Sequence, residues 1–183
     1  VHTSARNHEI EQLRAVSICF VVFGHMIIVS PFIAERIMPL FPYLGFGVGV
    51  DLFFCLSGYV VAGAYCDYFD RYRNSNQFWL AARMFWLRRI YRLLPSAWLW
   101  VGIGLILAIF FNSTGVFMDV EQNLKSVLAI ASFTANFAGF YGSWLAPNDV
   151  YWSLSLEEQF YFAFPLFLLL ITGRRARILV LLL

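Results

Sequence analysis

Two adjacent carboxylates interrupt one apolar segment of the chain. The segment YWSLSLEEQFYFAFPLFLLL, residues 151–170, carries Glu157 and Glu158 close to its outer end. A charged side chain at the centre of a membrane helix costs roughly 2.5–3.5 kcal/mol on insertion scales, so such groups usually have a use. A desolvated glutamate can accept or give a proton near neutral pH. The two side chains diverge by about 100° around a helix, so one of them at most faces a shared interior well. Either one can instead reach the outer head groups, and the sequence leaves this choice open.

A histidine and an arginine share one face of the first apolar segment. Arg14 and His25 are eleven residues apart, which is three helical turns plus about 20°. The rise of about 16 Å carries His25 towards the middle of the bilayer, where lipid offers its ring nitrogens no partner. This placement favours a functional ring that can take a proton. The alternatives are a histidine that only links two helices and an arginine that only anchors the topology.

The segment GVGVDLFFCLSGYVVAG holds weaker candidates. Asp51 lies inside an apolar run and is predicted to orient another group or to pair helices. Ser57 lies outside any G-x-S-x-G pattern, so its spacing gives little support for a nucleophile. Gly45, Gly47 and Gly49 alternate without a helical period, which indicates close packing or a break at the end of a helix.

The segment FWLAARMFWLRRIYRLLP contains three closely spaced arginines. Arg88 and Arg92 are four residues apart and share a helical face, while Arg89 points about 100° away. Guanidinium groups at this spacing could bind phosphates with two hydrogen bonds each, beside aromatic rings. The alternative is an ordinary basic and aromatic membrane interface.

The composition is that of a membrane protein. The 183 residues are 61% hydrophobic and only 13% charged, whereas soluble domains are about 45–50% apolar and about 25% charged. The three cysteines match no metal or redox spacing, and we predict no metal site. Membrane lipid is therefore an expected partner and nucleic acid is not. The chain begins with Val and ends inside an apolar run, so we expect residues 1–183 to be one domain that is incomplete at its C-terminus.

Four apolar runs are long enough to cross about 30 Å of hydrocarbon. They cover residues 13–34, 44–66, 93–111 and 150–172, and a fifth begins near 177. The segment 124–142 is ambiguous because it contains several polar residues. If it does not cross, one side of the membrane holds 11 of the 13 Lys and Arg residues, six of them in a loop over 67–92. The positive-inside rule then places the N-terminus in the cytoplasm and makes 124–142 a re-entrant or interfacial helix.

Four of these segments together resemble a known family. LRAVSICFVVFGH, GVDLFFCLSGYVV, FWLRRIYRLLP and YWSLSLEEQFYFAFP are similar in wording and order to motifs of the acyltransferase 3 family. The motifs extend from about residue 10 to residue 170, and the eleven-residue step from Arg14 to His25 is the family's first-helix signature. WSLSLEEQFY departs from the usual wording only at Leu156, where Val is common.

The resemblance implies an all-α, polytopic transmembrane helical bundle, of which this chain is the N-terminal half. The complete bundle would have about ten spans, each of about 20 residues. It also implies an O-acyltransferase of the cytoplasmic (inner) membrane that binds no cofactor. The enzyme would move an acyl group, often acetyl, from acyl-CoA to a carbohydrate on the far side, such as lipopolysaccharide or exopolysaccharide.

The resemblance further implies roles for individual residues. His25 is expected to be the catalytic base or a transient acyl carrier, and Glu157 or Glu158 to orient it or bind the acceptor hydroxyl. The expected substrate-binding residues are Arg14, Asp51, Ser57, Arg88, Arg89, Arg92, Trp152 and Ser153. One rival is a glycan flippase that makes no bond, and another is an inactive interaction subunit.

Overall fold

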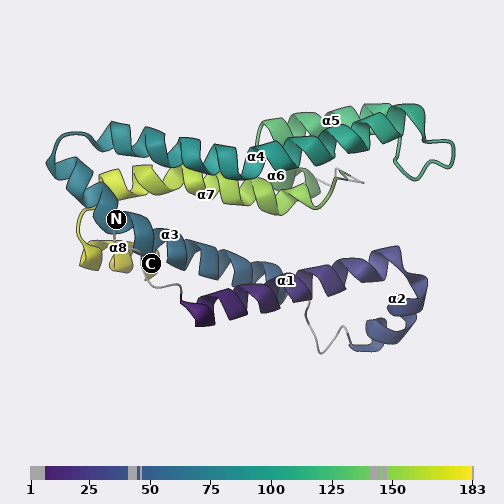
Figure 1. Ribbon diagram of the computed structural model, residues 1–183, viewed down its shortest axis with the longest axis horizontal. Coiled ribbons are helices and arrows are strands. Elements are labelled where there is room, and N and C mark those ends of the chain that lie inside the picture. The colour runs from purple at the N-terminus through teal and green to yellow at the C-terminus, as the bar shows by residue number, and fades with distance from the viewer. Residues whose placement is uncertain (1–6, 41–44, 46, 141–144, 146–147, 183) are drawn as a thin grey trace. The chain divides into compact units, whose positions relative to one another are not determined.

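The chain is helical throughout the part that can be described. The structure is a computed structural model that describes residues 7–40, 45, 47–140, 145 and 148–182 (Figure 1). Arg6, one of the basic residues counted above, lies outside these ranges. No strand occurs among the described residues, so the prediction of an all-α fold is confirmed. The elements are α1 (His8–Val29), α2 (Pro31–Ile37), a short 3₁₀ helix η1 (Met38–Leu40), α3 (Val48–Asn74), α4 (Phe78–Phe110), α5 (Val120–Ala131), α6 (Ala135–Phe140), α7 (Tyr151–Leu170) and α8 (Arg174–Leu182).

The chain forms two compact units. Residues 1–65 make the first unit, and residues 66–183 make the second. The first contains α1, α2, η1 and the greater part of α3. The second contains the end of α3 and the helices from α4 to α8, and each unit is described by itself below.

In the first unit, a glycine lets α1 and α3 approach closely. The side chain of Asn7 caps α1 by accepting a hydrogen bond from the Glu9 backbone at 3.0 Å. Arg14 lies over the ring of Phe53, with 5.8 Å from the guanidinium carbon to the ring centre. A Cβ atom at Gly49 would lie 2.7 Å from the Phe20 Cβ and 2.8 Å from the Ser17 carbonyl oxygen. Close packing, one of the two roles suggested for the alternating glycines, is thus observed at Gly49.

We expect Gly49→Ala to lower stability by about 1–3 kcal/mol, because the added methyl group would force the two backbones apart. The matched control is Gly63→Ala on the same helix, where a Cβ would meet nothing within 4 Å. The measurement is the thermal unfolding midpoint of the detergent-purified protein. Equal midpoints for the two variants would contradict the close approach of α1 and α3.

In the second unit, α7 runs antiparallel to the first half of α4 (Figure 1). The indole nitrogen of Trp86 donates to the carbonyl oxygen of Tyr161 at 3.1 Å. The hydroxyl of Tyr151 donates to the carbonyl oxygen of Ala97 at 3.3 Å. These two bonds fix the register, so α7 lies beside residues 78–97 of α4. The ends of α3, α4 and α7 share an aromatic core made of Phe69, Phe78, Phe85, Tyr161 and Phe164.

The second half of α4 packs against α5. Val101 of α4, Ile130 of α5, Ala135 of α6 and Leu145 form one buried cluster. The Asp119 side chain caps α5 by accepting from the Gln122 backbone at 2.7 Å. At 12 and 6 residues, α5 and α6 are only about 18 Å and 9 Å long, shorter than the roughly 30 Å of a bilayer core. This division into two short helices agrees with a segment 124–142 that enters the membrane without crossing it.

The predicted loop over residues 67–92 is wrong, because most of it is helical. α3 continues to Asn74 and α4 begins at Phe78, so only a tight turn separates them. Asn76 adopts a left-handed conformation with φ 58° in this turn, which Asn tolerates better than most residues. The arginines assigned to a loop therefore lie on helices. Among the described helices, α3 and α4 are long and apolar enough to cross a membrane.

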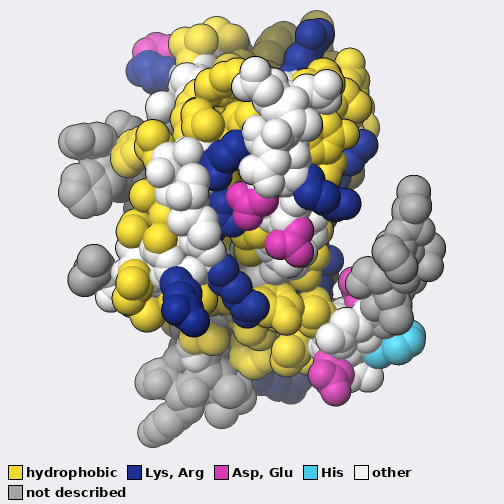
Figure 2. Space-filling view, turned by 90° about the vertical axis from the view of Figure 1, so that its left-hand side faces the viewer, with side chains coloured by type: hydrophobic (Ala, Val, Ile, Leu, Met, Phe, Trp, Pro, Cys, Tyr) yellow, Lys and Arg dark blue, Asp and Glu magenta, His cyan; other side chains and the backbone are white. Residues whose placement is uncertain are grey.

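A half-buried ion pair joins the end of α3 to the start of α8. Both terminal nitrogens of Arg177 donate to the carboxylate of Asp70, at 2.9 Å and 2.6 Å. The Nε of Arg177 donates to the carbonyl oxygen of Ile171, and Arg73 donates to that of Leu168. Figure 2 faces this end of the second unit and shows basic side chains gathered around acidic ones. The contacts place the end of α7 beside the end of α3.

This arrangement makes a prediction about membrane topology. Single cysteines replacing Ser75 and Thr172 are expected to react with an impermeant maleimide from the same side, and one replacing Ser113 from the other side. The native Cys19, Cys55 and Cys66 would first be changed to serine. Labelling at Thr172→Cys and Ser113→Cys from the same side would contradict a non-crossing α5–α6 segment.

Candidate active site

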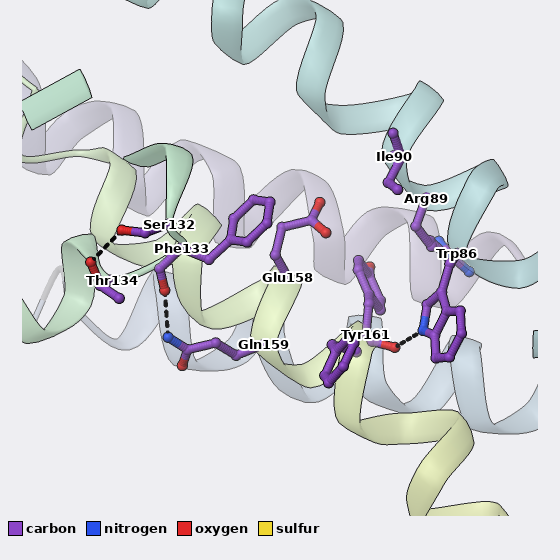
Figure 3. A pocket seen from close by; sticks show the side chains of 10 residues that line it. Trp86, Arg89, Ile90, Ser132, Phe133, Thr134, Glu158, Gln159 and Tyr161 are labelled. Atoms are coloured by element: carbon purple, nitrogen blue, oxygen red, sulfur yellow. Dashed lines mark hydrogen bonds between the residues drawn. The ribbon is translucent and has the colours of Figure 1, made fainter. Parts of the chain in front are cut away.

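A pocket of about 460 Å³ opens between α4, α7 and the turn that links α5 to α6 (Figure 3). All of it lies within the second unit. It is formed by Trp86, Arg89 and Ile90 of α4, by Ser132, Phe133 and Thr134 of the turn, and by Glu158, Gln159, Tyr161 and Phe162 of α7. Two of the predicted site residues, Arg89 and Glu158, therefore line one cavity.

Glu158 is the carboxylate that faces this pocket. Its side chain is buried, and one of its carboxylate oxygens has no hydrogen-bond partner among the described residues. A buried polar atom without a partner is uncommon in native proteins and calls for an explanation. A substrate group that donates a hydrogen bond would supply the missing partner. The question of which glutamate faces inward, left open by the sequence, is thus answered by burial at Glu158.

Glu157 has a partner on its own helix. It accepts a hydrogen bond from the Tyr161 hydroxyl at 2.5 Å, as expected for residues four apart on one face. Two other predicted site residues, Ser153 and Trp152, lie earlier on the same helix. Ser153 donates to the carbonyl oxygen of Val150 at 3.1 Å, and Trp152 is exposed. None of these three residues lines the pocket.

Arg89 is the one buried member of the arginine group on α4. Its guanidinium carbon lies 4.8 Å from the ring centre of Tyr161 and 5.4 Å from that of Phe85. Arg88 and Arg92 share a neighbouring, exposed face of the helix. Neither of them lines the pocket, whereas Arg89, about 100° from Arg88 around the helix, does.

The turn between α5 and α6 is held by a pair of side-chain amides. Gln159 donates to the Phe133 carbonyl oxygen at 2.6 Å and to the Asn136 side-chain oxygen at 3.0 Å. Asn136 donates back to the Gln159 side-chain oxygen at 3.1 Å. Phe133 has φ 54°, a left-handed conformation that costs non-glycine residues roughly 1–2 kcal/mol. Sequence reasoning missed Phe133, Gln159, Trp86 and Tyr161, and only the adjacency of Gln159 to the glutamates could have indicated one of them.

In the first unit, His25 has a defined hydrogen bond. Its Nδ1 lies 2.7 Å from the carbonyl oxygen of Val21. A carbonyl only accepts, so Nδ1 carries the hydrogen and Nε2 is left with a free lone pair. This tautomer suits a ring that accepts a proton at Nε2.

The other predicted residues of the first unit are spread along its helices. Arg14 lies against Phe53, with Glu11 at 3.7 Å. Ser57 is buried on α3, whereas Asp51 is exposed two residues before Phe53. The α1 helix ends at Val29, five residues before the predicted end of the span, because Pro31 begins α2.

Comparison with known proteins identifies the family of this chain. A family description for an acyltransferase domain, that of acyltransferase 3, matches residues 7–183. The chain belongs to the acyltransferase 3 family. The resemblance inferred from four short motifs is confirmed over nearly the whole chain. No solved structure shows significant similarity to it.

Two curated relatives of this acyltransferase 3 chain illustrate the family. Peptidoglycan O-acetyltransferase OatA of Listeria monocytogenes is 32% identical over 132 residues, which are 67% of this chain and 20% of the relative. O-acetyltransferase OatA of Staphylococcus aureus is 27% identical over 122 residues, 65% of this chain and 19% of the relative. The chain thus spans about a fifth of the length of the relatives it matches.

Proposed function

We propose that the protein is a membrane O-acetyltransferase that modifies a hydroxyl group of a cell-surface carbohydrate. The supporting observation is the buried Glu158, whose unpartnered oxygen faces a pocket that also receives the Arg89 side chain. The name of the Listeria monocytogenes relative favours peptidoglycan as the first acceptor to test, ahead of lipopolysaccharide or exopolysaccharide. We assign the protein to the cytoplasmic membrane, crossing it several times with its N-terminus inside.

The proposed reaction transfers an acetyl group from the sulfur of acetyl-CoA to a sugar oxygen. The hydroxyl oxygen attacks the thioester carbonyl carbon, a C–O bond forms and the C–S bond breaks. The hydroxyl proton passes to Nε2 of His25 and from there to the departing thiolate, so the products are the acetyl ester and free CoA. Glu158 is assigned to binding of the acceptor sugar, through a hydroxyl group other than the one that reacts. A positioned acid or base contributes typically about 10²- to 10⁴-fold.

The arginines of α4 are assigned to the donor. Arg89 lines the pocket, and Arg88 and Arg92 are exposed on a neighbouring face of the same helix. Guanidinium groups bind phosphates through two parallel hydrogen bonds. In the first unit, Arg14 is assigned to the same electrostatic role, whereas Asp51 and Ser57 are assigned to support of the helices.

Release of free CoA separates this proposal from its rival. Membranes that contain the complete protein are incubated with acetyl-CoA and with peptidoglycan fragments, and both free thiol and acetylated glycan are measured. An acetyltransferase releases thiol in step with glycan acetylation, and both depend on the acceptor. A flippase moves glycan without releasing thiol, and that result would overturn the proposal.

Lysine variants test the donor assignment. We expect Arg89→Lys to raise the apparent KM for acetyl-CoA roughly 10- to 150-fold, because a charge-assisted hydrogen bond is worth about 1.5–3 kcal/mol. Lysine keeps the positive charge but cannot make the planar two-pronged contact. Smaller increases are expected for Arg88→Lys and Arg92→Lys, whose side chains are exposed.

The matched control for this series is Arg83→Lys, an exposed position on the same helix. It should leave the KM for acetyl-CoA unchanged. If all three lysine variants keep the wild-type KM for acetyl-CoA, the donor assignment is wrong. These arginines would then serve only to orient the helices in the membrane.

A further inference from the structure

The pocket has few polar groups available to a ligand, although half of its lining residues are polar. Ser132 donates to the Leu128 carbonyl oxygen and pairs with the Thr134 hydroxyl at 2.8 Å. Gln159 uses its amide nitrogen and oxygen on the turn, as described above. These three side chains are therefore committed to holding the turn. The charged residues of the lining are Glu158, one of whose carboxylate oxygens has no partner among the described residues, and Arg89.

The remaining lining is apolar. Trp86, Ile90, Phe133, Tyr161 and Phe162 supply aromatic and aliphatic surface from three elements. A sugar ring would bring several hydroxyl groups that each need a partner, and desolvating them without one is unfavourable. An acyl chain needs no partner and gains from the same surface. The lining therefore fits the acyl part of the donor better than the body of a carbohydrate.

Phe133 occupies a special place in this lining. Its ring points from the α5–α6 turn towards the side chain of Glu158 (Figure 3). Its backbone has φ 54° at the C-terminal end of α5, where glycine is the usual residue. The amide of Gln159 holds the carbonyl of this same residue at 2.6 Å. A strained backbone that is fixed by a neighbouring side chain is typical of a functional position.

We propose that Phe133 limits the length of the acyl chain that the pocket accepts, and that Gln159 positions Phe133 for this purpose. The inference rests on the proposed function, since it takes the pocket as the place where the donor acyl group binds. The ring forms the wall of the pocket beside Glu158, so an acyl chain that extends past this carboxylate towards the α5–α6 turn would meet the ring.

The test compares acetyl-CoA with butyryl-CoA as donors for the complete protein in membranes, with peptidoglycan fragments as acceptor. Phe133→Ala removes the ring. Phe133→Gly removes the ring and also tolerates the left-handed backbone. It is therefore expected to fold even if Phe133→Ala does not. Phe137→Ala, an exposed position on α6 outside the pocket, is the matched control. The readout is the ratio of kcat/KM for butyryl-CoA to that for acetyl-CoA.

We expect this ratio to rise about tenfold in both Phe133 variants, because the enlarged pocket buries two additional methylene groups. Phe137→Ala should leave it unchanged. Gln159→Leu, which cannot hold the Phe133 carbonyl, should raise the ratio in the same direction by a smaller factor.

Three results would contradict the inference. One is an unchanged ratio in Phe133 variants that still transfer acetyl, and this leaves the proposed function intact. Another is loss of transfer from both donors in Phe133→Gly protein that accumulates normally, which would make the residue essential rather than selective. Finally, absence of acyl transfer by the wild-type protein would overturn the proposed function and this inference together.

Discussion

Replacing His25 with alanine is expected to reduce acetyl transfer by about 10²- to 10⁴-fold, the usual contribution of a positioned base. The hydrogen bond from Nδ1 to the Val21 carbonyl leaves the lone pair on Nε2, the state in which imidazole accepts a proton. The measurement is the rate of acetylation of peptidoglycan fragments at saturating acetyl-CoA. Because the side chain is exposed within its unit, the variant should still accumulate in the membrane.

Two further variants define what the ring does. His8→Ala changes the other described histidine of α1, at the start of the helix, and should retain activity. His25→Asn retains a donor near the position of Nδ1 but has no group that can take the proton, so it should be as inactive as His25→Ala. Near-normal acetylation by either His25 variant would remove this residue from the catalytic assignment.

Replacing Glu158 with glutamine is expected to cost about 10²-fold or more in kcat/KM for the acceptor. Glutamine preserves the shape of the side chain but removes its charge and replaces one acceptor oxygen by a donor. A hydroxyl that donates to the carboxylate in the pocket would keep only a neutral amide oxygen as its acceptor, which forms a weaker hydrogen bond. The measurement is the acceptor dependence of thiol release, with acetyl-CoA saturating.

Glu157→Gln is the comparison within the same pair. Glu157 is engaged by the Tyr161 hydroxyl and lies outside the pocket lining, so we expect a loss of about tenfold or less, the equivalent of one ordinary hydrogen bond. Equal losses in the two variants would contradict the assignment of the pocket carboxylate. A larger loss for Glu157→Gln would reverse it.

Local patterns in the sequence predicted the helices and the family but not the arrangement of the arginines. The shared face of Arg88 and Arg92 follows directly from their spacing. Helical spacing fixes only relative directions, however, and which face is buried depends on the partner helix. The partner is α7, set in register by Trp86 and Tyr161, residues separated by 75 positions. No periodicity within α4 contains that information.

The pocket could not be predicted from the sequence either, because its walls come from segments that are far apart in the chain. Its third wall comes from a short turn at Ser132, Phe133 and Thr134, inside a segment whose composition predicted only that it does not cross the membrane. Phe133 is one of 20 phenylalanines and has no local signal for a left-handed backbone. Its conformation depends on Gln159, which lies 26 residues away. Glu158, unlike Phe133, could be picked out from the sequence as one of two adjacent glutamates. Its burial in the structure then distinguishes it from Glu157.

The ion pair between Asp70 and Arg177 has a consequence for how the protein is made. Its partners are 107 residues apart, so α3 must be synthesised and inserted long before Arg177 leaves the ribosome. A chain in which the α5–α6 segment crossed the bilayer would carry Arg177 to the opposite side. Arg177, which is buried, would then lack its partner. The pair can therefore form only in chains whose α3 and α8 ends lie on the same side of the membrane, and it stabilises that threading of the helices over the alternative.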